Sequence, residues 1–312
     1  MWGSVLDRAG IQEPEARRGY TAQLQAVRRF APAEYLAARL LLPALIQPDI
    51  IALVAFMHET DDRIDRGHRL EREEALQRWK RLTKEALAAG TSSQPVLQTL
   101  SWTVGRHPML HGRIDAFLDG AAQEVTWEGF SSEAEVVQYI QGYSLPALML
   151  SMCLLAPDGA AAAAEFERAC LKLITAMQRL DFLEDIAEDV REGRVGISDE
   201  ALTQHGLTAK DLLPEAAGTA PVAALIATQT DIAAASLEAA QPIVDLTVAA
   251  YRPFLRAVLQ VQEARSAAVR KARASLLVGP CGPSPVRCGA ALLQQMVLRI
   301  LVALGDRRRQ HG

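Results

Sequence analysis

Acidic residues end an apolar stretch at residues 50–65 (IIALVAFMHETDDRID). In a helix, Asp61 and Asp65 of this stretch stand at positions i and i+4 and share one face. The two preceding turns have no polar face, which predicts that the helix lies in the interior of the protein. Buried carboxylates need a compensating cation, so the spacing predicts a cation site at Asp61 and Asp65.

A second acidic segment repeats the arrangement at residues 170–189 (CLKLITAMQRLDFLEDIAED). Asp181, Asp185 and Asp189 are spaced to stack at i, i+4 and i+8 on one helical face. The apolar positions that precede them are Leu171, Leu173, Ile174 and Met177. A single spacing of this kind is common on solvated helices, whereas two copies that each follow an apolar stretch favour a paired site.

Oxygen ligands from two facing helices suit a hard divalent cation, Mg²⁺ or alternatively Mn²⁺. We expect Asp61, Asp65, Asp185 and Asp189 to be the metal ligands, with Glu188 as an additional ligand. A diphosphate would complete the coordination, and the metal would neutralise the charge that grows on it as a C–O bond ionises. The alternative is that the second segment is a solvated charged face, because it carries further acidic residues beside the aspartates.

The composition predicts an all-α protein that does not bind nucleic acid. Alanine and leucine dominate, aromatic residues make up only 5% of the chain and β-branched alternation is rare, so we expect helices throughout and no sheet. Half of the residues are apolar, which is enough for a substantial core. The net charge of −4 argues against a nucleic-acid partner, because binding to the phosphate backbone needs a basic surface.

The cysteines and the apolar runs bear on the cellular location. The four cysteines lack the spacing of a metal site and are not preceded by a signal peptide, so we expect reduced thiols in a cytoplasmic protein. The longest apolar run, residues 145–156, is too short to cross a bilayer. We therefore expect no membrane span.

Prolines separate long helical patterns, and no interdomain linker lies between them. We expect a single domain over residues 1–312, with a motif-bearing core at about 30–210 and C-terminal helices at about 218–308. Two loops are expected at 207–221 and 278–287, both outside the acidic segments.

The sequence resembles the squalene/phytoene synthase family from about residue 30 to 210, and more weakly to about 300. Four blocks carry the resemblance: residues 35–43 (YLAARLLLP), 54–65 (VAFMHETDDRID), 117–124 (FLDGAAQE) and 178–197 (QRLDFLEDIAEDVREGRVGI). The last block is the most specific, because a glutamine followed by an acid pair and then Gly-Arg-Val is an improbable coincidence. The resemblance implies the single-domain isoprenoid synthase bundle, an all-α fold with a central active-site cavity.

The resemblance also implies roles for residues outside the acidic pairs. It makes Gln178 a polar cavity residue near the diphosphate, and it places Tyr35, Arg39 and Arg194 near the diphosphate or the flap that follows the second motif. Arg39 can equally be a surface residue, and for Tyr35 and Tyr251, a further candidate for substrate binding, the alternative is core packing with a satisfied hydroxyl.

Three positions depart from the family pattern. The family usually has an arginine, an asparagine and an arginine where this chain has His58, Asp181 and Glu184, with Asp181 retained as a substrate-binding candidate. Joining two prenyl diphosphates head to head requires positive charge for two diphosphate groups beyond their metals. The cavity of this chain is therefore expected to hold one diphosphate more readily than two.

A further departure lies in the middle of the chain, at residues 139–149 (YIQGYSLPALM). The family keeps small residues where this chain has Tyr143, Ser144 and Leu148, and Pro146 interrupts the local hydrogen bonding. Bulk at Tyr143 and Leu148 would shorten a tunnel for the prenyl chain. Core packing alone is the alternative explanation of these side chains.

These features predict a Mg²⁺-dependent prenyltransferase that ionises one allylic diphosphate, such as dimethylallyl diphosphate. A small non-phosphorylated aromatic acceptor would capture the cation. In this the chain is similar to the offshoot of the family that prenylates carbazoles in bacterial natural-product biosynthesis. His58 would accept the proton released on rearomatisation, or would instead be a partner of Asp61 or Asp62. The alternative functions are head-to-head condensation to a squalene- or phytoene-like product, and an inactive family member that serves as a binding partner.

Overall fold

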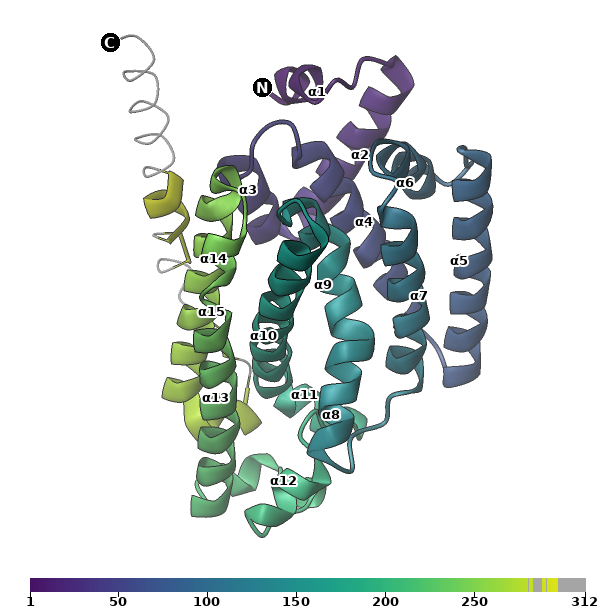
Figure 1. Cartoon of the computed structure of the whole chain (residues 1–312). Coiled ribbons are helices and arrows are strands. Elements are labelled where there is room, and N and C mark those ends of the chain that lie inside the picture. Colours follow the sequence, from purple (N-terminus) through teal and green to yellow (C-terminus); the bar gives the residue numbers. More distant parts are fainter. Residues whose placement is uncertain (280, 283–287, 290, 297–312) are drawn as a thin grey trace, which may run out of the picture.

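The computed structural model is a bundle of helices, and the structure describes residues 1–279, 281–282, 288–289 and 291–296 (Figure 1). Among these residues there is no strand, which confirms the predicted all-α fold. The longer helices are α2 (Pro14–Phe30), α3 (Pro32–Leu41), α4 (Gln47–Ile64), α5 (Arg69–Ala89), α6 (Pro95–Arg106), α7 (Leu110–Thr126), α9 (Leu145–Met152), α10 (Ala160–Glu184), α13 (Ala220–Ala240) and α15 (Arg252–Ala272). The shorter ones are α1 (Trp2–Arg8), α8 (Glu133–Tyr139), α11 (Ile186–Glu192), α12 (Asp199–Gln204) and α14 (Ile243–Leu246).

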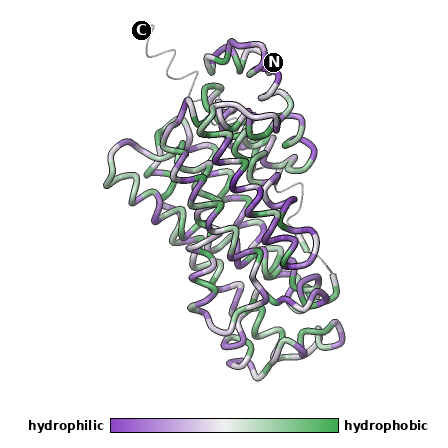
Figure 2. The backbone as a smooth tube through the Cα atoms, turned by 90° about the vertical axis from the view of Figure 1, so that its right-hand side faces the viewer, coloured by the Kyte–Doolittle hydropathy of each residue, from purple (hydrophilic) through white to green (hydrophobic). Residues whose placement is uncertain are grey.

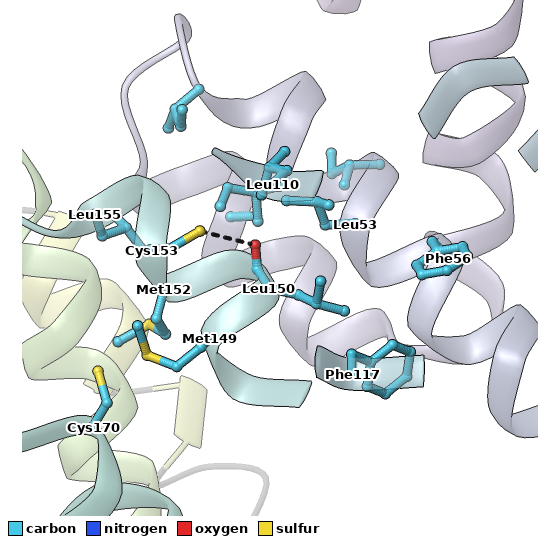
Figure 3. Close-up of a cluster of buried hydrophobic side chains, with 14 of the residues drawn as sticks. Leu53, Phe56, Leu110, Phe117, Met149, Leu150, Met152, Cys153, Leu155 and Cys170 are labelled. Atoms are coloured by element: carbon cyan, nitrogen blue, oxygen red, sulfur yellow. Dashed lines mark hydrogen bonds between the residues drawn. The ribbon is translucent and has the colours of Figure 1, made fainter. Parts of the chain in front are cut away.

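The bundle has an N-terminal and a C-terminal half that share one core. Helix α4 packs against α2, α5 and α6, whereas α10 packs against α9, α13 and α15, and α7 links the two groups through α5 and α9 (Figure 1). Apolar and polar residues alternate along the helices, so that each buries one face (Figure 2). The core cluster includes Phe56 of α4, Phe117 of α7, Leu150 of α9 and Cys170 of α10 (Figure 3).

Proline starts several of these helices. Pro14, Pro32 and Pro95 occupy the first turn of α2, α3 and α6, where a missing N–H costs nothing because the first N–H groups of a helix have no partner within it. The predicted loop at 207–221 forms two short 3₁₀ turns, Ala209–Asp211 and Pro214–Ala216.

The C-terminal predictions are covered only in part. The expected helices from about 218 begin with α13 at Ala220, and their last part, 297–308, lies outside the described residues. The same is true of 280 and 283–287 in the second expected loop. By length and composition the segment Ala220–Leu246 could cross a membrane, but core helices have the same properties, and α13 packs along α10. This segment does not establish a membrane span.

A π-helix, Ile140–Ser144, connects α8 to α9 directly before Pro146. Leu145 donates its N–H to the carbonyl of Ile140, and Pro146 has no N–H to give to Gly142. The Gly142 carbonyl instead faces α7 so closely that a Cβ on Gly120 would lie 2.2 Å from it. Only glycine at position 120 allows α7 and the π-helix to approach in this way.

A buried polar network holds the beginning of α4. Asp49 is fully buried and accepts hydrogen bonds from Arg106 Nε at 3.1 Å and from Tyr20 Oη at 3.4 Å, and it contacts His107 Nε2 at 3.0 Å. Burial, together with the charge of Asp49, raises the pKa of Tyr20. The network fixes the end of α4 that lies opposite its acidic residues.

Candidate active site

Asp61 and Asp65 lie in the last turn of α4 and just after it, as their spacing predicts. The N–H of Asp65 donates to the carbonyl of Asp61 at 2.9 Å, so helical geometry continues through both residues. Tyr143 of the π-helix donates its hydroxyl hydrogen to Oδ1 of Asp61 at 3.2 Å. Burial, with the charges of Asp65 and Glu124, raises the pKa of Asp61 to about 7, although the hydrogen bond from Tyr143 opposes the shift.

The carboxylate of Asp65 lies nearer the exposed rim of the site. Loss of hydration raises its pKa, and the positive charges of Arg72 and Arg194 partly offset this effect. Arg72 is itself held by the main chain, because it donates to the carbonyls of Ile64 and, at 3.2 Å, of Glu124. The end of α4 thus carries two carboxylates whose negative charge is incompletely compensated by the protein.

The second acidic segment is not one continuous helix. Helix α10 ends at Glu184, Asp185 has φ −95° and ψ 0°, and α11 begins at Ile186, so the expectation of a straight stack through Asp189 is wrong. The hydrogen bonds nevertheless continue across the bend, from Asp185 N to Asp181 O and from Asp189 N to Asp185 O, each at 2.9 Å. The three aspartates therefore remain one turn apart, but on two differently directed segments.

Asp185 and Asp189 also have raised pKa values. Burial is the largest cause of both shifts. The negative charges of Asp181 and Glu184 raise the pKa of Asp185 further. The negative charge of Asp185 likewise raises the pKa of Asp189, which reaches about 7. Glu188 is exposed on α11 beside them. Mutual repulsion and desolvation at these carboxylates are the features that a bound cation would relieve.

Arg194 brings the two acidic segments into one electrostatic environment. It follows Gly193, which ends α11 with φ 75°, and its guanidinium lies 5.4 Å from the ring centroid of Trp127 and pairs with Glu192 at 2.6 Å. Its charge lowers the pKa of both Asp65 and Asp189. Arg194 is therefore within electrostatic reach of both Asp65 of α4 and Asp189 of α11, and the shared metal site stays a prediction.

Arg265 of α15 contacts the second acidic segment and was not among the residues singled out from the sequence. Its Nη2 pairs with Glu184 Oε2 at 2.6 Å and also with Asp181 Oδ1, and its Nε lies 3.2 Å from both oxygens of Glu184. The two acids that replace the family's asparagine and arginine thus share one positive charge, which comes from a separate helix. No local pattern in the sequence of α15 indicated this contact.

Gln178 and Leu148 lie between the two halves of the bundle. The Gln178 Oε1 atom accepts a hydrogen bond from Ser144 Oγ at 2.8 Å, next to Tyr143. Tyr143 stacks on Phe117 with ring centroids 6.3 Å apart. Leu148 is half-buried and packs against two core clusters. Both explanations given for Tyr143 and Leu148, a shortened tunnel and core packing, fit these positions.

The structure keeps Arg39 away from the acidic segments. Its Nη1 donates to Gln47 Oε1, and its guanidinium lies 4.9 Å from the centre of the Trp2 ring. Because Gln47 starts α4 and Asp61 is near its end, Arg39 is roughly 20 Å from Asp61 along the helix axis. Arg39 is therefore better described as a surface residue, the alternative given above, than as a residue that contacts the diphosphate.

Tyr35 and Tyr251 are half-buried against the main core cluster. Tyr251 precedes the first turn of α15, roughly 20 Å along the helix axis from Arg265. Core packing, the alternative considered for both tyrosines, describes these positions.

His58 is exposed, and its ring stacks on Phe30 at a centroid distance of 3.5 Å. Asp61 accepts a hydrogen bond from Tyr143, and Asp62 pairs with Arg66. His58 is therefore not the partner of either aspartate, which was the alternative role considered for it. His58 stands one turn before Asp61, at the rim of the site.

The acidic residues fit a metal that is held jointly by protein and substrate. Within the described ranges, no three histidine, cysteine, aspartate or glutamate side chains converge as a complete metal site. Mg²⁺ usually takes one or two carboxylates and completes its octahedron with water and phosphate oxygens. The donor set and its raised pKa values suit such a partial shell, in which Asp61, Asp65, Asp185 and Asp189 would hold the ion.

Two surface hollows lie elsewhere in the bundle. One of about 380 Å³ lies between α1 and α2 and is lined by Trp2 and Arg17; the other, of about 340 Å³, lies between α13 and α15 beside Glu263. Neither contains a residue of the acidic segments, so the central cavity implied by the family resemblance stays a prediction.

Comparison with known proteins decides the family. Residues 27–287 match the family model of squalene/phytoene synthase. The chain belongs to this family. A curated relative, the bifunctional protein CrtB/UppS of Streptomyces coelicolor, is 32% identical over 207 residues. The match covers 65% of this chain but only 35% of that protein, so the chain spans about a third of the relative's length.

Solved structures of the family share the fold. The squalene synthase HpnC from Alicyclobacillus acidocaldarius superimposes with a TM-score of 0.73 at 20% identity, over 88% of this chain and 99% of that chain. A dehydrosqualene synthase in complex with ligand gives a TM-score of 0.76 at 19% identity, over 91% and 97% of the two chains. These likenesses confirm the isoprenoid synthase type of bundle predicted from the sequence.

Proposed function

We propose that this family member is a Mg²⁺-dependent prenyltransferase that ionises one allylic diphosphate, dimethylallyl diphosphate being the expected donor. It would transfer the prenyl group to a non-phosphorylated aromatic acceptor, such as a carbazole, in natural-product biosynthesis. Family membership supports an enzyme that transfers groups from isoprenoid diphosphates. The choice of a neutral acceptor rests on one observation: most arginines beside the acidic residues already pair with carboxylates of the protein. Arg72 and Arg191 are held by main-chain carbonyls instead.

The pairing extends across both acidic segments. Arg265 is held by Asp181 and Glu184, and Arg194 by Glu192. On α4, Arg63 pairs with Glu59 at 2.7 Å and Arg66 pairs with Asp62. A second diphosphate would bring several negative charges and would need donors beyond the metals of the first. A neutral arene makes no such demand, so the existing charges favour a site for one diphosphate.

The proposed reaction breaks the C–O bond of the donor and one C–H bond of the arene, and it forms one C–C bond. Divalent cations, when bound, would neutralise the charge that develops on the leaving diphosphate. The diphosphate leaves with the electron pair of the C–O bond, an arene carbon attacks the allylic cation, and that carbon then loses its proton. Tyr143 orients Asp61 through its hydrogen bond, and Asp65, Asp185 and Asp189 complete the negative surface that holds the cations.

Aromatic side chains lie beside Asp61, where they would favour the binding of both an arene and an allylic cation. Tyr143 lies between Phe117 and Tyr139, with ring centroids at 6.3 and 5.5 Å. Ring faces attract cations, and ring edges and faces pack against other arenes. His58, exposed at the rim one turn before Asp61, is the candidate acceptor of the released proton and can pass it to solvent.

Head-to-head condensation of two prenyl diphosphates is the second candidate, and the family match favours it. The two candidates differ in what they consume. Condensation needs two farnesyl or geranylgeranyl diphosphates and no acceptor, whereas aromatic prenylation needs both a donor and an arene.

A product assay separates the two candidates. The protein would be incubated with Mg²⁺ and dimethylallyl, geranyl, farnesyl or geranylgeranyl diphosphate, with and without carbazole and indole compounds. A prenylated arene that forms from dimethylallyl diphosphate supports our proposal. A hydrocarbon that forms from farnesyl or geranylgeranyl diphosphate alone would replace it with condensation. If no diphosphate is released or bound under any condition, the chain is a binding partner and both enzymatic readings are wrong.

A further inference from the structure

A positively charged side chain from another helix, Arg265, lies against the second acidic segment. Asp181 and Glu184 are three residues apart on α10 and share a face, and Arg265 reaches them from α15, 84 and 81 residues further along the chain. The Arg265 and Glu184 side chains are each only 14% exposed, whereas the Asp181 side chain is 43% exposed. The contact is therefore largely screened from water.

Each nitrogen of Arg265 has an acceptor. Nε and Nη2 face the Glu184 carboxylate, Nη2 also faces Asp181, and Nη1 donates to Gln262 Oε1 at 3.0 Å. Gln262 lies on the same face of α15 and is buried. The guanidinium is thus fixed on its own helix as well as by α10, which is the geometry of a permanent ion pair rather than of a donor waiting for a ligand.

The position of this ion pair is relevant to metal binding. Asp185 directly follows Glu184, and the charges of Asp181 and Glu184 raise its pKa while that of Arg265 lowers it. Without Arg265, the bend between α10 and α11 would carry Asp181, Glu184, Asp185 and Glu188 with no nearby counter-charge from α15. A cluster of carboxylate oxygens of that density is the type of environment that divalent cations occupy.

We propose that Arg265 is a positioning residue that takes the place of a divalent cation at Asp181 and Glu184. A guanidinium stays protonated at every working pH, so its single positive charge permanently offsets one of the two negative charges while it hydrogen-bonds to both carboxylates. The carboxylates that remain to bind exchangeable metal ions are then those of Asp61, Asp65, Asp185 and Asp189. The site then binds fewer cations than its number of acidic residues suggests. The inference depends on the proposed function only in assuming that divalent cations bind the acidic segments.

Counting bound Mn²⁺ tests this proposal without any substrate. The full chain would be titrated with Mn²⁺ alone at about pH 8, where carboxylates are charged, and free Mn²⁺ would be followed by its electron paramagnetic resonance signal. We expect Arg265→Met to bind one more Mn²⁺ per chain than the wild type. Arg265→Lys keeps the positive charge and should bind the wild-type number. Equal numbers for all three proteins would overturn the proposal.

A further variant covers the case in which Arg265→Met does not fold. Glu184→Gln keeps an acceptor for Arg265 and, on our proposal, removes no metal ligand, so its Mn²⁺ count should equal that of the wild type. A lost Mn²⁺ in Glu184→Gln would show that Glu184 binds metal itself and would overturn the proposal. If Arg265→Met folds, adding Glu184→Gln to it should abolish the gained Mn²⁺. Because no prenyl donor or acceptor is present, failure of the prenyl-transfer assay and failure of this inference are separate results.

Discussion

The hydroxyl of Tyr143 donates a hydrogen bond to Oδ1 of Asp61 at 3.2 Å, joining the π-helix to the first acidic segment. Tyr143 also packs between Phe117 and Tyr139. The residue that was singled out for its bulk therefore also makes a polar contact with a predicted metal ligand. Bulk and hydrogen bonding have different consequences, and they can be separated by substitution.

Tyr143→Phe keeps the ring and removes the hydrogen bond to Asp61. We expect kcat/KM to fall roughly 10- to 100-fold, since a hydrogen bond to a charged group contributes about 1.5–3 kcal/mol. The preference among dimethylallyl, geranyl and farnesyl diphosphates should not change. Tyr143→Ala combined with Leu148→Gly should instead shift the preference towards longer donors. An unchanged preference in the double variant would mean that these side chains only pack between helices. A changed preference in Tyr143→Phe would mean that the hydroxyl, and not bulk alone, affects the choice of donor.

Asp61→Asn and Asp189→Asn should each lower kcat by more than roughly 100-fold while the protein stays folded. Both carboxylates have raised pKa values, so removing their charge relieves repulsion in the metal-free protein. We expect Tm of the metal-free variants to rise by about 1–2 °C for each kcal/mol relieved. Asp62→Asn is the control, because Asp62 pairs with Arg66 outside the acidic pair. Wild-type turnover in both main variants would show that the segments are structural.

The stability of the metal-free protein should fall as the pH rises. Asp61 and Asp189 have pKa values of about 7 in the folded state, against an ordinary value of 3.8. Between these values the native state holds protons that the unfolded chain has lost, so the free energy of unfolding decreases with pH and levels off above about pH 7. Thermal unfolding in EDTA between about pH 5 and pH 8 would measure this. The Asp61→Asn/Asp189→Asn double variant should show a flatter profile; an equal slope would contradict the assignment.

Removing divalent cations should abolish turnover. The carboxylates of Asp61, Asp65, Asp185 and Asp189 cannot attract a diphosphate without cations between them. Excess EDTA should therefore stop diphosphate release, and Mg²⁺ or Mn²⁺ added back should restore it. Full turnover in EDTA is the result that would refute the assignment of these residues.

Gly120→Ala should destabilise the protein by about 1–3 kcal/mol, because the added Cβ meets the Gly142 carbonyl at 2.2 Å and neither backbone can move independently. Gly112→Ala in the same helix is the matched control. It has open space around it and should be neutral or stabilising by up to about 1 kcal/mol. Denaturant unfolding of both variants measures the difference, and equal stabilities would show that α7 and the π-helix can move apart.

The sequence predicted the parts of the fold and of the site that depend on local spacing. Helical periodicity alone places Asp61 and Asp65 one turn apart, and Pro146 signalled the interruption that the structure shows as a π-helix. Each of these features is specified by residues within a few turns of one another. The pairing of the two acidic segments was instead inferred from two similar motifs far apart in the chain, and the family resemblance added roles for further residues.

Features formed by distant segments were not predicted. Arg265 lies 81 residues from Glu184, and nothing in α15 distinguishes it from an arginine on a solvated face. The stacking of His58 on Phe30 depends on how α2 packs against α4. The bend at Asp185 has no glycine or proline before it, so its local sequence gave no signal.

The carboxyl end of α4 has a consequence for the order in which ligands enter. Asp61 and Asp65 lie at this end. Aligned peptide dipoles place about half a negative charge there, with the same sign as the carboxylates beside it. A bare diphosphate that approaches the site is therefore repelled by the main chain as well as by the side chains. A divalent cation is attracted by both, so we expect the metal to bind before the prenyl donor or together with it.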